Sequence, residues 1–308
     1  MTMHSLPRMG AVAAAAGLLG LAVAVGGTPP AAPKAKPAPE RWWSPGEGRP
    51  MPASLDYANA QGSLRVLVEG GPMATKDHPF FAPLGANGRA CVTCHQPADA
   101  MSLSAQTVRE RWQATGGKDP LFAAIDGSNC PALPQEARAS HSLLLDRGLF
   151  RIQLPWPVRE WNGKPVTPDF TIEVVRDPNG CNSGPAHGPS AGNISVYRRV
   201  RPVANMKYLL AVGFPFDPKQ GFALPRDPIN GQMMSGNIMA DNRTGTLALQ
   251  MADAAHGHLQ FAQKLTPAQY RQITDFEMRV FTAQQVDAHG NNLDTLGAKG
   301  GPEHLRAS

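Results

Sequence analysis

The residues with the clearest chemical potential are Cys91, Cys94 and His95, which form the pattern C-x-x-C-H. Two thiols at this spacing can each form a thioether with a porphyrin vinyl group, and the adjacent histidine can ligate the iron. A C-x-x-C pair also occurs in thioredoxin-like redox motifs and as half of a zinc site. No second Cys/His pair follows at zinc-finger spacing, and a glycine-rich stretch stands where a redox motif would follow a strand. The pattern therefore predicts one covalent haem c.

The first 27 residues have the features of a signal peptide. A short, weakly basic start precedes an apolar run over residues 10–25, and small residues suited to cleavage end that run. The run is shorter than the roughly 20 residues that span a bilayer, although an uncleaved anchor is the alternative. Residues 28–40, rich in Pro, Ala and Lys, predict a tether. We expect a periplasmic protein with no transmembrane span after cleavage, which fits the assembly of bacterial c-type cytochromes outside the cytoplasm.

Composition narrows the function further. The net charge is +5, and the Lys and Arg residues are scattered, so nothing indicates binding to nucleic acid. Two cysteines remain outside the haem motif, Cys130 and Cys181, both in loop-like contexts. In an oxidising compartment they would most simply form a disulfide, and two buried free thiols are the alternative.

Hydrophobic periodicity and turn residues predict the elements around the motif. Strands are expected over residues 64–68, 149–154, 170–175 and 194–200. Helices are expected from a cap at Ser102 or Ser104 to about residue 115, and over 135–147, 244–265 and 266–285. The predicted fold is a mainly α cytochrome c-like domain over residues 41–285, with much irregular structure and a small β insert. The insert covers about residues 120–205 and would be held by the Cys130–Cys181 disulfide, and residues 286–308 would form a flexible tail.

Several stretches together resemble the N-terminal haem domain of the bacterial dihaem cytochrome c peroxidase-like proteins, the group that includes MauG. The stretches are residues 78–89 before the haem motif, 96–99 after it, 126–131, 143–149, 197–199, 250–254 and 257–258. Two departures are clear. Family members usually carry a second C-x-x-C-H domain, and here only one motif is present. Residues 239–243 also replace the Met-Trp-Asp-Gly-Arg-like segment that the family tends to have before its distal helix.

The second axial ligand of the iron is open to several residues: His258, His256 and Met239, followed by Met206, Met233, Met234 and Met251. His258 leads, because it continues an apolar helical stripe and matches the family's Gly-His; the alternative is a core histidine. Met239 is next, since methionine ligation suits an electron carrier, although methionine more often fills cores. An open position would leave His258 as a catalytic acid/base. Phe81 is a candidate haem contact or core residue, and Arg89 a candidate partner of a haem propionate.

Two functions follow from these features. The first is an exported c-type cytochrome that transfers electrons in a periplasmic redox chain. Its partner would be a cytochrome, a cupredoxin or a second haem domain. The alternative, which the resemblance implies, is the haem domain of a peroxidase-like enzyme that reduces hydrogen peroxide together with a second haem protein. A lone haem domain lacks half of the dihaem circuit, so peroxidase activity does not carry over directly.

Overall fold

A computed structural model describes residues 40–157, 160–161, 164–211, 219, 226, 231, 235, 237–240 and 244–308. All of them belong to the larger of the two units into which the chain divides, Ala38–Ser308. The expected signal peptide and the tether up to residue 39 lie outside the described residues. Within the described part, no helix combines the length and the apolar character that crossing a membrane requires.

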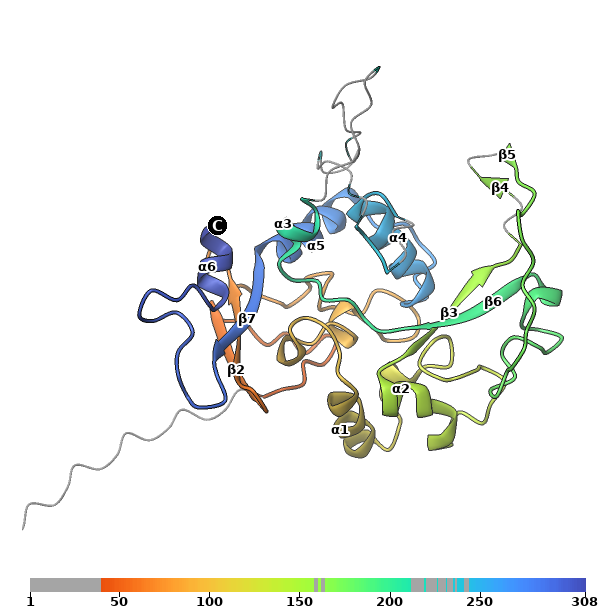
Figure 1. The fold of residues 1–308 in the computed structure, drawn as a ribbon, viewed down its shortest axis with the longest axis horizontal. Coiled ribbons are helices and arrows are strands. Elements are labelled where there is room, and N and C mark those ends of the chain that lie inside the picture. The colour runs from red at the N-terminus through yellow and green to blue at the C-terminus, as the bar shows by residue number, and fades with distance from the viewer. Residues whose placement is uncertain are drawn as a thin grey trace, which may run out of the picture. The chain divides into compact units, whose positions relative to one another are not determined.

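A three-stranded antiparallel sheet joins the beginning and the end of the described chain (Figure 1). Strand β1 (Ser54–Asn59) pairs with β2 (Gly62–Val68), and β2 pairs with β7 (Val280–Val286). The apolar ends of β2 and β7 are buried, with Val68 opposite Val280. Burial of these β-branched and aromatic side chains stabilises a pairing between segments more than 200 residues apart.

Helices α4 (Leu247–Gly257) and α5 (Pro267–Arg279) contribute to the larger hydrophobic core, together with the short α3 (Met206–Leu209). Thr246 caps α4 by accepting from the Leu249 N–H. The expected start of α5 is confirmed: Thr266 and Gln269 form a reciprocal capping box, and Pro267 is the first helical residue. These caps fix the starts of the two helices that share a hydrophobic core with Cys91.

A second core packs α1 (Ala105–Thr115) against α2 (Ser142–Arg147) and β3 (Phe150–Pro155). Helix α1 starts at the Ser104 cap and ends at Gly116 in the left-handed conformation, as the sequence predicts. Strand β3 pairs antiparallel with β6 (Asn193–Arg198), and β4 (Glu160–Trp161) pairs with β5 (Lys164–Pro165). Residues 120–205 therefore contain short strands, as expected.

The prediction of a mainly α cytochrome c-like fold is wrong. Helices account for 28% and strands for 17% of the residues that the structure describes, so neither type dominates. The described part has six α-helices, most of them short, and small antiparallel sheets separated by irregular chain. Glycines end some of these elements, as Gly116 does after α1 and Gly148 after α2, which limits their length.

Three individual elements also differ from expectation. Residues 170–175 form no strand in the structure. The last long helix ends at Arg279 rather than near residue 285, because Val280 and its successors pair with β2. In the segment expected to be a flexible tail, α6 (Pro302–Ala307) packs against β7 and β2 (Figure 1). Residues 280–286 and α6 are held in these positions by contacts with β2, which lies more than 200 residues earlier in the sequence.

Candidate functional site

The C-x-x-C-H segment folds into a tight turn that presents its chemical groups to one side. Residues Cys91–Thr93 form a 3₁₀ turn, and the His95 N–H donates to the Cys91 carbonyl at 3.1 Å. Buried Gln96 braces this turn by donating to the Val92 carbonyl at 2.6 Å and to the Trp43 carbonyl at 3.0 Å. The positions of both thiols and of the imidazole are therefore fixed by backbone hydrogen bonds and by one buried amide.

The environment of Cys91 and Cys94 differs from that of a reactive thiol pair. Burial raises the pKa of the Cys94 thiol to about 12 and the pKa of Cys91 further still. Thiol–disulfide chemistry and zinc binding both use the thiolate, which low-pKa sites stabilise. Burial thus shifts both pKa values away from the thiolate form that the two alternatives use.

His95 is held in an orientation suited to ligating iron. Its Nδ1 lies 3.0 Å from the Met101 carbonyl oxygen, so Nδ1 carries the proton and Nε2 keeps its lone pair. Burial lowers the pKa of His95 to about 4, which keeps the ring neutral. The Phe80 ring packs beside it, with 6.3 Å between the ring centroids. A neutral imidazole oriented by a backbone carbonyl is the usual form of a histidine ligand.

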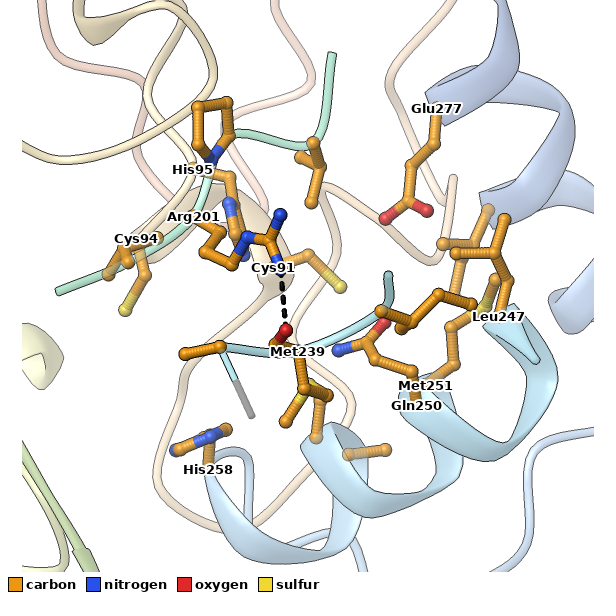
Figure 2. A pocket seen from close by; sticks show the side chains of 18 of the residues that line it. Cys91, Cys94, His95, Arg201, Met239, Leu247, Gln250, Met251, His258 and Glu277 are labelled. Atoms are coloured by element: carbon orange, nitrogen blue, oxygen red, sulfur yellow. Dashed lines mark hydrogen bonds between the residues drawn. The ribbon is translucent and has the colours of Figure 1, made fainter. Parts of the chain in front are cut away.

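Cys91, Cys94 and His95 line one mostly apolar cavity of about 200 Å³. Helix α4 and the segment after β6 supply much of its remaining wall. Figure 2 shows His95 on one side of the space and His258 and Met239 on the other. The structure thus brings together the attachment motif and both leading candidates for the second axial ligand.

His258 is positioned from both its backbone and its ring. Its ring Nδ1 lies 2.6 Å from the Asp126 carboxylate, so that Nε2 is the nitrogen left for a ligand, and the residue lines the cavity. Its backbone carbonyl accepts from the Asn87 side chain at 2.8 Å and from Arg89 at 3.2 Å. Gly85 packs so closely against Leu259, the residue after His258, that an added Cβ would lie 1.7 Å from the Leu259 carbonyl oxygen. The segment before the haem motif therefore holds the end of α4 in place.

Met239 lies on the cavity wall in the left-handed backbone conformation, with φ of 66°. Its carbonyl accepts from the Arg201 guanidinium at 2.5 Å (Figure 2). Both Met239 and His258 thus lie on the wall of the cavity that would supply the sixth ligand of a bound haem iron. His258 alone of the two has a carboxylate partner of the kind that orients metal-binding histidines.

Two residues predicted to touch the haem have other places in the structure. Arg89, fully buried, bonds to Asp126 at 2.5 Å and to the carbonyls of Pro120 and Leu121. It is not among the described residues that line the cavity, and its contacts give no support to the expected role at a propionate. Phe81 likewise lies away from the cavity wall, in a buried aromatic cluster with Phe80 and Phe276 at 5.1 Å between centroids.

The Arg89–Asp126–His258 chain is the main charged network behind the cavity. Burial on its own would raise the pKa of Asp126, but the Arg89 guanidinium and the His258 ring together hold it below its ordinary value. Asp126 is therefore a carboxylate, and it accepts from both partners. Arg89 is thus a positioning residue for His258, acting through Asp126.

Four charged residues that line the cavity were not predicted from the sequence. Arg198, Arg199 and Arg201 line it from the end of β6 onward, and Glu277 lines it from α5. The three arginines were visible as a basic run at the end of the strand predicted over residues 194–200, but nothing local says which way they point. Glu277 had a clearer signal, because it stands four residues after Ile273 on the apolar face of its helix.

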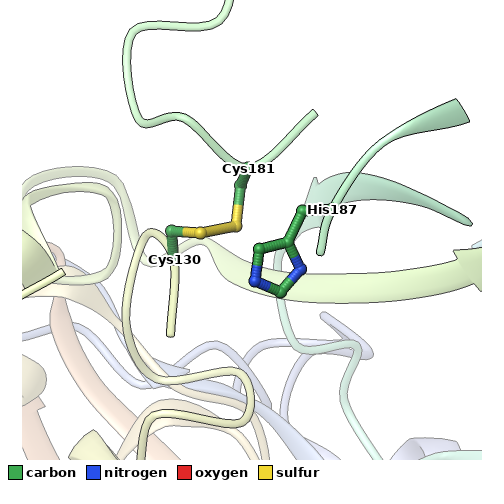
Figure 3. A group of neighbouring side chains, drawn as sticks. All are labelled: Cys130, Cys181 and His187. Carbon is green, nitrogen blue, oxygen red and sulfur yellow. A yellow bond between two sulfur atoms is a disulfide. The ribbon is translucent and has the colours of Figure 1, made fainter. Parts of the chain in front are cut away.

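The predicted Cys130–Cys181 disulfide is confirmed, with 5.4 Å between the Cα atoms. Figure 3 shows the His187 ring beside it, and the three potential ligand atoms lie within 4.8 Å of one another. Because both sulfurs are consumed by the bond between them, His187 is the sole remaining donor, and this group does not form a metal site.

The donor set and the cavity fit a covalent haem. Two free thiols and one neutral imidazole face one mostly apolar cavity, and a second histidine faces it from the opposite side. Three guanidinium groups also line it, and these groups suit the carboxylates of haem propionates. No protein-family model, no curated protein and no solved structure matches the chain. The assignment of function therefore depends on the geometry of this site.

Proposed function

We propose that this protein is an exported c-type cytochrome with one covalent haem that transfers electrons between periplasmic redox partners. The observation that carries the proposal is the shared cavity of Cys91, Cys94 and His95 with His258 on its far side. Cys91 and Cys94 would form the two thioethers, and His95 would ligate the iron. When bound, haem supplies a one-electron couple whose potential depends on the axial ligands and on burial.

The chain's own residues have three tasks in this proposal. The Met101 carbonyl and the Asp126 carboxylate orient the two imidazoles, so that ligation requires little rearrangement when the electron moves. The apolar wall formed by Leu247, Met251 and Ala255 of α4 excludes water from the site. The guanidinium groups at residues 198–201 place positive charge beside it, which favours an acidic cytochrome or cupredoxin as partner.

Optical and EPR spectra of the purified protein, combined with a redox titration, test this function. An electron carrier should give a six-coordinate, low-spin spectrum and one reversible one-electron transition. A five-coordinate, high-spin spectrum that changes when peroxide is added would contradict the carrier function and support an enzyme.

The alternative function is that of a haem domain in a peroxidase-like enzyme, paired with a second haem protein. The specific observation in its favour is the His258–Asp126 pair, in which a partly exposed imidazole is hydrogen-bonded to a buried carboxylate. Such a pair can hold and release a proton at the cavity. Turnover of hydrogen peroxide that requires an added haem protein would favour this function.

Export and family membership are part of the same proposal. The disulfide and the N-terminal apolar run support an oxidising compartment outside the cytoplasm. The motifs in their order support a relationship to the dihaem cytochrome c peroxidase-like group. Detection of the mature, cleaved chain in a periplasmic fraction tests the location.

A further inference from the structure

A buried carboxyl group on the cavity wall has no role in attaching or ligating the haem. Glu277 projects from α5, and Figure 2 shows its carboxyl group turned into the cavity. The residue is 4% exposed, and its Oε2 atom has no hydrogen-bond partner. Burying a carboxylate without a partner costs several kcal/mol, so such a group is retained protonated or has a function that requires it.

The surroundings of Glu277 leave burial as the controlling influence. Burial raises the pKa of Glu277 to about 8, and no charged neighbour offsets this effect. The titratable or charged groups on the elements around this wall are Cys91, Cys94, His95, Arg151, Arg198, Arg199, Arg201, Lys207, Asp253, His256 and His258. Both cysteines lose their thiols when thioethers form, and Lys207 donates to the carbonyls of Arg306 and Ser308. A change of charge inside the cavity therefore acts on this carboxyl group with little screening.

We propose that Glu277 is the proton-binding site that couples proton uptake to reduction of the haem. This inference rests on the proposed function, since it needs a haem in the cavity. At a pH above the pKa of Glu277 in the oxidised protein, the ionised carboxylate takes one proton from water as one electron arrives from the redox partner protein. The electron reduces ferric to ferrous iron, and the carboxylate becomes a carboxylic acid. In the reverse direction the proton returns to water as the acceptor takes the electron.

The coupling follows from electrostatics in a space of low dielectric constant. Reduction removes one positive charge from the cavity, which makes a nearby carboxylate less favourable and its protonated form more favourable. Uptake of the proton keeps the net charge of the cavity constant. A group that already titrates near neutral pH responds to this change within the physiological range.

The experiment is a spectroelectrochemical titration of the holoprotein between pH 5 and pH 10. The wild-type potential should fall with pH by up to about 59 mV per pH unit, the value for one proton per electron. Glu277→Gln should remove this slope, and Glu277→Asp should keep it in a displaced pH range. Glu303→Gln, at an exposed position on α6, is the matched control and should behave as wild type.

An infrared redox-difference spectrum gives a second, independent readout. A protonated-carboxyl band should appear on reduction of the wild type, and it should be absent from Glu277→Gln. A wild-type spectrum without that band, or a Glu277→Gln slope equal to that of the wild type, would overturn the inference. Absence of any reversible haem couple would instead overturn the proposed function itself. A reversible couple with a pH-independent potential would overturn only the role of Glu277.

Discussion

Replacing Asp126 with asparagine should destabilise the protein strongly, because it leaves the Arg89 cation buried without its counter-ion. The side chains of Arg89 and Asp126 are 1% and 4% exposed, and their closest atoms are 2.5 Å apart. Removing one partner of a buried ion pair typically costs about 3–5 kcal/mol. For a domain of this size, each kcal/mol lowers Tm by about 2–4 °C, so we expect a decrease of roughly 6–20 °C.

The matched control for Asp126→Asn is Asp56→Asn. Asp56 also pairs with an arginine, Arg65, at 2.7 Å, but its side chain is 50% exposed. An exposed pair contributes about 0–1 kcal/mol, so this variant should change Tm by only a few degrees. Denaturant and thermal unfolding of both holoproteins, followed by circular dichroism, gives the comparison. Equal, small losses of stability in the two variants would refute the structural role of the Arg89–Asp126 pair.

Three further outcomes follow from the site and its surroundings. His258→Ala should convert a low-spin spectrum to high-spin, whereas Met239→Leu should change it little; a spectral change that follows Met239 instead would make methionine the ligand. Replacing Cys130 and Cys181 with alanine should lower the unfolding free energy by about 2–5 kcal/mol, and a loss below 1 kcal/mol in denaturant titrations would contradict this. Stability of the haem-free protein should fall between about pH 4.5 and pH 8, because folded Glu277 keeps a proton that the unfolded chain releases; unchanged pH dependence in Glu277→Gln would contradict this.

Features set by nearby residues were predictable from the sequence. The Ser104 and Thr266 caps, and the glycine that ends α1, depend on contacts within a few positions of the chain. The disulfide was also predictable, because only two cysteines remain once the haem motif is assigned. Local chemistry is thus a sufficient guide to these features.

Features set by distant residues were not predictable. Residues 280–286 continue the pattern of α5, yet they form β7 because β2, far earlier in the chain, offers a strand edge. Arg89 has the sequence context of an exposed arginine, but Asp126 and two backbone carbonyls hold it in the interior. Pairing with β2 thus turned residues that were expected to be helical into a strand. Such long-range pairing contributed to the wrong prediction of a mainly α fold.

The measurement that tests the central claim most directly is the detection of covalent haem on the purified mature protein. The protein should keep its haem through acid–acetone extraction and give the pyridine haemochrome spectrum of a c-type haem. Its intact mass should include one porphyrin. Replacing Cys91 and Cys94 with alanine should abolish the attachment. Haem that passes entirely into the solvent phase, or zinc bound in its place, would contradict the account.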